Sequence, residues 1–260
     1  MTATTLSSLP SLLAVFAHPD DESLVAGGVL AQHAAAGART AVVTATWAPD
    51  SPRAGELSDA VRILGAGRPR MLGYADARVP QSAPGRARFC DAPLDETVKR
   101  LVGHLREFRP DIVVTHDAYG NLTGHPDHVH THRVTTLALQ ASGLEHLCPE
   151  AGEPWQPSAL YLATHPHSGV GELGTLLPRV GKSLLSVGDE RVTATVDVRP
   201  WLAQKWTAIL AHRSEVERPR SLPGILSRLP VDVRQRIIST EYFTRFDVRP
   251  TPGGMRALTR

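Results

Sequence analysis

The sequence has few cysteines, only Cys90 and Cys148 among its 260 residues. Neither belongs to a C-x-x-C pair, and two are too few for a disulfide framework. This scarcity excludes the class of small secreted proteins held together by disulfides. It favours idle thiols in a reducing compartment.

Long hydrophobic runs and blocks of like charge are also missing. No stretch approaches the roughly 20 apolar residues of a membrane-spanning helix, and the start "MTATTLSSLP" lacks the basic region of a signal peptide. The formal net charge is only +2, and the basic residues are scattered. We therefore expect a cytoplasmic protein with no membrane insertion and no nucleic-acid partner.

The chain does have enough apolar residues, 42%, for a substantial core. Apolar and β-branched runs alternate with helical patterns through residue 165. The predicted strands are 12–17, 40–46, 70–73, 111–116 and 159–165, and the predicted helices are 24–36, 54–64, 94–108 and 126–140. This alternation predicts an α/β fold with a Rossmann-like, mostly parallel sheet and helices on both faces.

The last third of the chain is less regular. It predicts a strand over 191–198 and helices over 200–213 and 231–243. We expect residues 1–170 to form the Rossmann-like catalytic core. The smaller, irregular α+β portion, residues 171–260, is expected to complete the same domain and the substrate pocket. A homo-oligomer is compatible with the sequence, which leaves the oligomeric state open.

Two short motifs combine imidazole with carboxylate groups. "FAHPDDE" directly follows the first predicted strand, and "GHPDH" follows the strand 111–116 after a turn-rich loop. Ligands of an open parallel sheet bind outside the carboxyl ends of its strands, which is where both motifs belong. Crowded carboxylates need a cation or hydrogen-bond donors beside them. A divalent metal with two histidine ligands and one aspartate meets that need, and zinc and iron(II) both suit this set.

A purely structural interpretation competes with the metal site. Asp20 and Asp21 could cap the following helix, and the histidines of "HPDHVHTH" could be solvated helix residues. For one motif alone this interpretation would be reasonable. Two H-P-D motifs after separate strands favour the metal site.

The paired motifs resemble those of the PIG-L/LmbE family of metal-dependent de-N-acetylases, which act on N-acetylglucosamine-type sugars. The segments "RAGEL", "LGYAD", "RPDIVVTHD", "HRSE" and "EYF" extend the resemblance over most of the chain, and the mycothiol-pathway deacetylases and amidases look most similar. The resemblance implies a Zn²⁺-dependent hydrolase, with Fe²⁺ as the alternative metal. Its substrate would be a small-molecule amino-sugar glycoside.

The resemblance also implies roles for the motif residues. The expected metal ligands are His18, Asp21 and His128. Asp20 would be the general base, and His125 would stabilise the oxyanion or act as general acid. Asp127 would orient His125 through a hydrogen bond. Glu22 supports the site or the fold.

The candidates for substrate binding carry a weaker signal. Arg53 and Glu56 begin a helix after the second strand, and Asp76 and Arg78 lie in the loop after the third. Each pair is as well explained by surface ion pairing. His116 ends the strand 111–116 near the pocket, while His130 and His132 are expected to support the helix or the ligands rather than bind metal.

One position departs from the family pattern. The mycothiol-precursor deacetylases carry a tyrosine two residues before the histidine of the second motif, where this chain has Thr123. Tyr119, in the preceding loop, is the candidate to replace it.

Two alternative functions remain open from the sequence. One is amide cleavage of thiol S-conjugates instead of deacetylation. The other is a non-catalytic nucleotide-binding module, which would need a glycine-rich turn after the first strand, where "HPDDES" stands instead.

Overall fold

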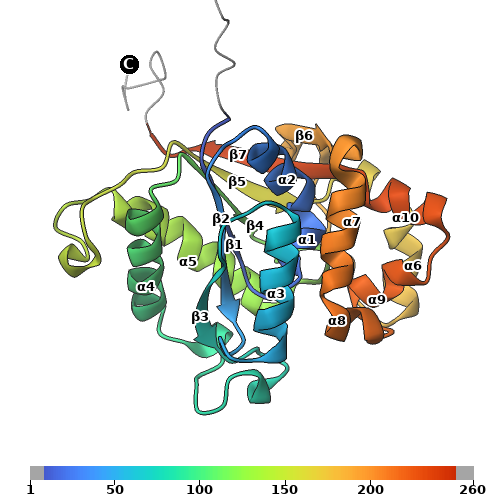
Figure 1. Ribbon diagram of the computed structural model, residues 1–260, viewed down its shortest axis with the longest axis horizontal. Helices are drawn as coiled ribbons and strands as arrows, with labels where there is room; N and C mark the ends of the chain where they lie inside the picture. Colours follow the sequence, from blue (N-terminus) through green and yellow to red (C-terminus); the bar gives the residue numbers. More distant parts are fainter. Residues whose placement is uncertain (1–8, 250–260) are drawn as a thin grey trace, which may run out of the picture.

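The fold is built on one seven-stranded sheet with helices packed on both of its faces (Figure 1). The computed structural model describes residues 9–249, so residues 1–8, which bear on the expected lack of a signal peptide, lie outside it. The strands are β1 Leu12–Phe16, β2 Thr40–Thr46, β3 Arg70–Tyr74, β4 Ile112–His116, β5 Ala159–Thr164, β6 Ala194–Asp197 and β7 Thr240–Asp247, in the order β3-β2-β1-β4-β5-β7-β6. The predicted α/β class is confirmed.

Ten α-helices accompany the sheet in the described part of the chain. They are α1 Asp21–Val25, α2 Gly27–Ala35, α3 Pro52–Ile63, α4 Leu94–Phe108, α5 Pro126–Ser142, α6 Leu173–Arg179, α7 Leu202–Ala211, α8 Arg213–Glu217, α9 Leu222–Ser227 and α10 Val231–Ile238. Between residues 9 and 249, none is long and apolar enough to cross a membrane.

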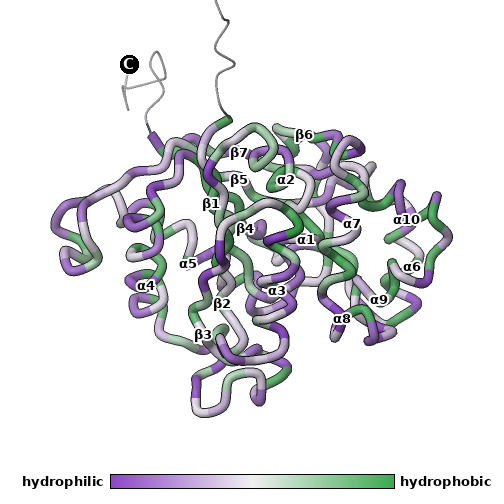
Figure 2. Tube along the Cα trace, viewed as in Figure 1, coloured by the Kyte–Doolittle hydropathy of each residue, from purple (hydrophilic) through white to green (hydrophobic). Residues whose placement is uncertain are grey.

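The alternation of side chains along β1 divides the core into two layers. Leu13 and Val15 pack with residues of α4 and α5 on one face. Leu12, Ala14 and Phe16 pack with α2, α3 and α7 on the other. All five side chains are buried, and the hydrophobic centre of the sheet is visible in Figure 2. A strand covered on both faces needs this continuous apolar run, which is why the sequence pattern was clear.

The sheet order changes direction between β1 and β4. β1 pairs in parallel with β2 on one side and with β4 on the other. The connections from these two strands therefore diverge and leave a crevice at their carboxyl ends. The residues that follow β1 and β4 meet at this crevice.

The C-terminal part corrects two predictions. The predicted helix 231–243 ends at Ile238 as α10, and β7 follows it, antiparallel between β5 and β6. Strand β7 buries Glu241 and Phe243 on one side of its pleat, a short period-2 pattern that the helical pattern before it obscured. Helices α6, α8 and α9 were not predicted. The division of the chain at residue 170 stays a prediction.

The predicted helix 24–36 is also interrupted. It is divided at Ala26 into α1 and α2. A Cβ atom at Gly28 would lie 2.3 Å from Val198 Cβ, so this glycine lets the start of α2 pack directly on the C-terminal part.

A buried ion pair joins the C-terminal part to this helix. Lys205 Nζ of α7 lies 2.7 Å from Glu241 Oε1 of β7, and the two side chains are each 1% exposed. The Glu241 carboxylate also accepts hydrogen bonds from the backbone N–H groups of Gly28 (2.7 Å) and Val29 (2.9 Å). A negative charge at the N-terminus of α2 is favourable, so one carboxylate stabilises three elements.

Glu241→Gln should destabilise the protein by about 3–5 kcal/mol, because it leaves the Lys205 ammonium buried without a counter-charge. The double variant Lys205→Met with Glu241→Gln should recover part of that loss. Urea unfolding followed by circular dichroism measures both. A single-variant loss below about 1 kcal/mol would show that the pair is not an essential buried charge.

Candidate metal centre

The first motif forms a tight turn between β1 and α1. The backbone N–H of His18 donates to Asp21 Oδ2 at 2.8 Å, which folds the turn back on itself. Asp20, at φ 134°, has a positive backbone angle that non-glycine residues rarely adopt. Arg53 holds it there by donating hydrogen bonds to the Pro19 carbonyl and the Asp20 carboxylate.

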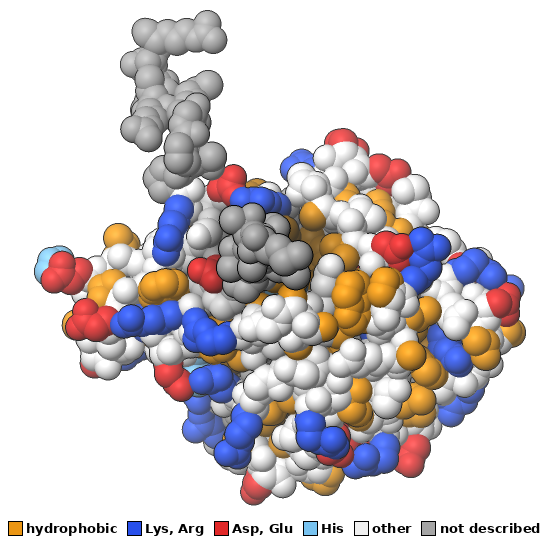
Figure 3. All heavy atoms as spheres, turned by 45° about the horizontal axis from the view of Figure 1, so that its top comes forward, with side chains coloured by type: hydrophobic (Ala, Val, Ile, Leu, Met, Phe, Trp, Pro, Cys, Tyr) orange, Lys and Arg blue, Asp and Glu red, His pale blue; other side chains and the backbone are white. Residues whose placement is uncertain are grey.

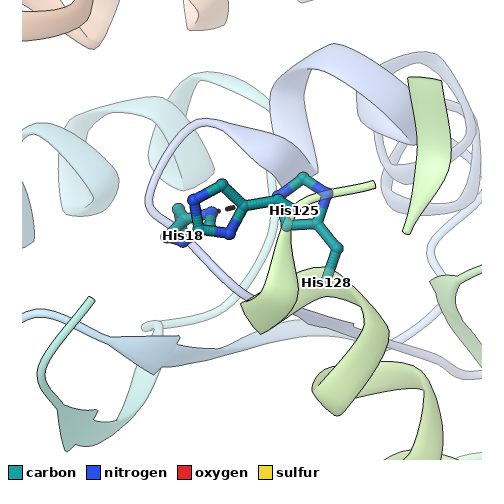
Figure 4. A group of neighbouring side chains, drawn as sticks. All are labelled: His18, His125 and His128. Atoms are coloured by element: carbon teal, nitrogen blue, oxygen red, sulfur yellow. Dashed lines mark hydrogen bonds between the residues drawn. The ribbon is translucent and has the colours of Figure 1, made fainter. Parts of the chain in front are cut away.

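The second motif forms the start of α5. Pro126 occupies the first helical position, where its missing N–H costs nothing. His125 precedes the helix and His128 lies in its first turn, so their side chains share one side of the helix. Figure 4 shows both imidazoles directed toward His18, which comes from the turn after β1.

Three side chains meet at this point, with their possible ligand atoms at almost equal separations. His18 Nδ1 lies 3.1 Å from His128 Nε2 and 3.3 Å from Asp21 Oδ2. His128 Nε2 lies 3.3 Å from Asp21 Oδ1. Ligand atoms about 2.0–2.2 Å from a tetrahedral zinc ion lie about 3.3–3.6 Å apart, and the three separations between these side chains are close to that spacing.

In the neutral forms of the two imidazoles, the hydrogen bonds around them place the ring proton away from the facing nitrogens. His18 Nε2 lies 3.2 Å from the carboxylates of both Asp76 and Asp127, which only accept, so it carries the ring proton. His128 Nδ1 likewise donates to the Gly120 carbonyl at 3.2 Å. In the neutral imidazoles the facing nitrogens therefore present lone pairs, an arrangement typical of metal-binding histidines.

The electrostatics of the site favour a cation at this point. Burial lowers the pKa of His18, but the carboxylates of Asp127, Asp21 and Asp76 outweigh it and raise this pKa to about 10. Positive charge beside His18 is thus strongly stabilised. A divalent cation can supply that charge, so His18, Asp21 and His128 fit a metal ion.

Two further side chains of the motifs border the three ligand candidates. Burial raises the pKa of the Asp20 carboxyl to about 7, while the Arg53 guanidinium opposes the shift. His125 is fixed by the backbone N–H of Asp127, which donates to its Nδ1 at 3.3 Å. The neutral His125 ring consequently carries its proton on Nε2 and can donate it to a bound group.

A cavity of about 420 Å³ opens over these residues. His18, Asp20, Asp21, His125 and His128 line one part of its wall. Another part comes from the chain beyond residue 170, including Leu177, Lys182, Arg218 and Leu222. The volume suits a small-molecule ligand.

Comparison with known proteins identifies the family. A family model described as PIG-L, GlcNAc-PI de-N-acetylase, matches residues 13–139. A curated protein of Rhodococcus jostii, 1D-myo-inositol 2-acetamido-2-deoxy-alpha-D-glucopyranoside deacetylase, is 38% identical over 89% of this chain and 90% of its own length. The chain belongs to the PIG-L family. A deacetylase of the same name from Streptomyces avermitilis is 34% identical over 89% of this chain and 90% of its own length.

Solved structures share the PIG-L fold. N,N'-diacetylchitobiose deacetylase from Pyrococcus horikoshii matches with a TM-score of 0.64 and 20% identity, over 92% of this chain and 84% of its own. The 4-carboxy-2-hydroxymuconate hydratase GalB from Pseudomonas putida matches with a TM-score of 0.55 and 21% identity, over 94% of this chain and 98% of its own. At these identities the likeness concerns the fold only, and the fold carries more than one chemistry.

Two of the expected substrate-binding residues do not reach the cavity of this PIG-L protein. Glu56 accepts hydrogen bonds from the backbone N–H (2.9 Å) and hydroxyl (2.6 Å) of Ser214, so its carboxylate serves to anchor α8. Tyr119 is 56% exposed and does not line the cavity, whereas Thr123 does. The expectation that Tyr119 replaces the missing tyrosine is therefore not supported by the geometry.

The other three expected substrate-binding residues, Arg53, Asp76 and Arg78, do line the cavity. One carboxylate oxygen of Asp76 accepts hydrogen bonds from the backbone N–H groups of Arg78 (2.6 Å) and Val79 (3.1 Å), and the other oxygen faces His18. It thereby orients a ligand candidate, a role that the sequence did not suggest.

The Asp127 carboxylate does not bond His125, the partner that the resemblance implied. Its Oδ2 atom lies 3.8 Å from His125 Nδ1, too far for a hydrogen bond, but 3.2 Å from His18 Nε2. The backbone N–H groups of Ala77 (2.8 Å) and Cys90 (3.0 Å) fix the carboxylate in this position. Asp127 therefore orients His18, while only its backbone N–H contacts the His125 ring.

Three other histidines lie beside the ligand candidates and support the candidate site. The His116 ring stacks on His128 with centroids 3.9 Å apart, and its Nε2 atom accepts the Ala17 N–H at 3.1 Å. His132 Nδ1 contacts the His116 carbonyl at 3.0 Å, and His130 packs edge-on against Phe89.

Sequence reasoning missed the role of His212. Its Nε2 atom lies 2.8 Å from Glu22 Oε1, and both side chains are fully buried. The other oxygen of Glu22 accepts the backbone N–H of Asp20 at 3.1 Å. The "HRSE" segment that carries His212 was noted for its family likeness, but residues 190 positions apart give no local sign of contact.

We expect the purified protein to bind one Zn²⁺ per chain, and His18→Ala or His128→Ala to weaken that binding more than about 100-fold. Loss of a ligand should cost more than loss of its hydrogen-bond partner, which typically costs about 10–100-fold. Competition with a chromophoric chelator measures the affinity.

The exposed His167 offers a matched control, because its imidazole bonds Ser186 outside the cavity. His167→Ala should bind zinc as the unaltered protein does. Equal zinc affinity in all of these variants, with circular dichroism showing them folded, would exclude a metal centre formed by His18 and His128.

Proposed function

We propose that the protein is a metal-dependent hydrolase that removes the acetyl group from an N-acetylglucosamine-type small-molecule glycoside. The observation that carries the proposal is the meeting of His18 Nδ1, His128 Nε2 and the Asp21 carboxylate within 3.1–3.3 Å at the floor of the cavity. The deacetylase names of the relatives support the reaction and favour it over amide cleavage of thiol conjugates. We propose further that it acts in the cytoplasm.

His18, Asp21 and His128 would hold the metal, Zn²⁺ or Fe²⁺. Such an ion acts as a Lewis acid and lowers the pKa of water at its open position. Around it, Asp76 and Asp127 keep the His18 ring in the ligand orientation through its Nε2–H.

Asp20 and His125 would carry the proton transfers. The Asp20 carboxylate borders the ligand group and takes a proton from the attacking water, whose hydroxyl joins the acetyl carbon. The Nε2–H of His125 donates to the oxyanion that develops on the carbonyl oxygen. The C–N bond then breaks, the amine nitrogen takes the proton that Asp20 received from the water, and acetate and the free amino sugar leave.

Asp20→Asn should lower kcat for a neutral N-acetylglucosaminide by about 10²–10⁴-fold, because an amide cannot accept the proton. The hydrogen bond from Arg53 can persist to the amide oxygen, so the metal content should stay at the unaltered level. Release of acetate and metal analysis are measured on the same sample. Turnover within about threefold of the original would remove Asp20 as the base.

His212→Ala should lower kcat by about 10–100-fold with little change in KM, because Glu22 then loses the partner that aims it at the Asp20 backbone. His212→Gln retains an N–H donor and should recover much of the loss. Steady-state kinetics with acetate detection separate kcat from KM. A change confined to KM, or no recovery with glutamine, would contradict a positioning role.

A further inference from the structure

The cavity carries more basic side chains than its carboxylates can pair. Apart from the histidines, its basic lining residues are Arg53, Arg78, Lys182, Arg218 and Arg220. The acidic lining residues are Asp20, Asp21, Asp76 and Glu215. Asp21 and Asp76 face the imidazole of His18, so they do not neutralise the basic residues.

The other two carboxylates are used by two guanidinium groups. Arg53 contacts Asp20 at 3.1 Å and Glu215 at 3.0 Å. Arg218 shares the same Glu215 oxygen at 2.7 Å. Glu215 is thus shared by two guanidinium groups. No acidic side chain of the lining remains to pair with the other basic residues.

Three cations of the cavity remain without a counter-charge. Within residues 9–249, the side chains of Arg78 and Lys182 have no hydrogen-bond or ion-pair partner. The Arg220 guanidinium donates only to the neutral carbonyl of Val180, at 2.7 and 3.2 Å. A charged side chain that lines a cavity without a partner is available to a ligand.

Two of these cations, Arg78 and Lys182, lie close enough to repel each other. Burial lowers the pKa of the half-buried Lys182 ammonium, and the neighbouring charges of Arg78 and Arg218 lower it further, against Asp20 and Glu215. Lys182 is therefore within electrostatic reach of Arg78, of Arg218 and of the proposed base. Arg78 is also within electrostatic reach of His125.

The cations come from segments that are far apart in the chain. Arg78 follows β3, Lys182 follows α6, and Arg220 lies between α8 and α9. On the face shown in Figure 3, in contrast, basic and acidic side chains are interspersed. Three segments that deliver unpaired cations to one cavity form a site for negative charge, and guanidinium and ammonium groups are the donors that bind phosphoryl oxygens best.

We propose that Arg78, Lys182 and Arg220 bind a phosphate group on the glycoside, so that the substrate is a phosphorylated N-acetylglucosaminide. The inference rests on the proposed deacetylase function and narrows its substrate class. The acetamide of the same substrate faces the metal ligands. A neutral glycoside fills the same cavity without relieving the repulsion among the cations.

Four substrates with the same sugar test this class: methyl N-acetylglucosaminide, its carboxymethyl analogue, N-acetylglucosamine 1-phosphate and N-acetylglucosamine 6-phosphate. At low ionic strength, kcat/KM for one of the two phosphates should exceed that for the neutral methyl glycoside by about tenfold or more. The carboxymethyl glycoside should fall between them. Added salt should reduce the preference.

The variants Arg78→Gln and Lys182→Gln should each lower the ratio of phosphate to neutral kcat/KM by about tenfold. Arg68→Gln, an exposed arginine that does not line the cavity, is the matched control and should keep the ratio. Calorimetric titration of the zinc-loaded protein with inorganic phosphate gives a second readout. Phosphate binding should weaken in the two cavity variants and not in the control.

The outcomes separate this inference from the proposed function. Deacetylation of the neutral glycoside at a rate equal to or above both phosphates overturns the phosphate site and leaves the deacetylase function standing. Phosphate binding that is unchanged in both cavity variants also overturns the site. Deacetylation of none of the four substrates, with phosphate binding that still depends on Arg78 and Lys182, supports the anion site and contradicts the deacetylase function.

Discussion

The candidate site depends on the two ring nitrogens that face each other, His18 Nδ1 and His128 Nε2, at 3.1 Å. In the neutral rings neither carries a proton, because the opposite nitrogen of each donates its proton elsewhere. Two lone pairs and a carboxylate at such a distance repel one another unless positive charge lies between them. The arrangement is stable only with a cation or a proton between these groups. The surrounding loops supply the acceptors that hold the two rings in this orientation.

The acceptors that fix the rings come from different parts of the chain. Asp76 follows β3, Asp127 belongs to α5, and the Gly120 carbonyl follows β4. The order of the sheet brings them together, since the connections diverge between β1 and β4 and leave their loops on one crevice. The C-terminal part then closes the crevice with α8, α9 and the segment after α6, and it also anchors Asp20 through Glu22 and His212.

Local pattern was sufficient wherever an element was regular and covered by neighbours. The bounds predicted for β2 and α4 agree with the structure, because Thr40–Thr46 is rich in β-branched residues and Leu94–Phe108 is strongly amphipathic. The three ligand candidates came from the resemblance of two local motifs to those of the PIG-L family. The features that escaped prediction depend on contacts between residues far apart in the chain. They are the contacts of Glu241 with Lys205, of His212 with Glu22 and of Glu56 with Ser214. A carboxylate looks the same in sequence whether it contacts a ligand, caps a helix or neutralises a buried lysine, and only the tertiary fold decides among these.

The position of β7 has a consequence for how the protein is made. This strand comes last in the described chain, yet it lies inside the sheet, with β5 on one side and β6 on the other. During synthesis β5 therefore keeps an open edge, and β6 has no strand to pair with, until residues near 247 have left the ribosome. A nascent chain that stalls before this point presents unpaired backbone groups that other chains can bind, so completion of the last strand protects the newborn protein from aggregation.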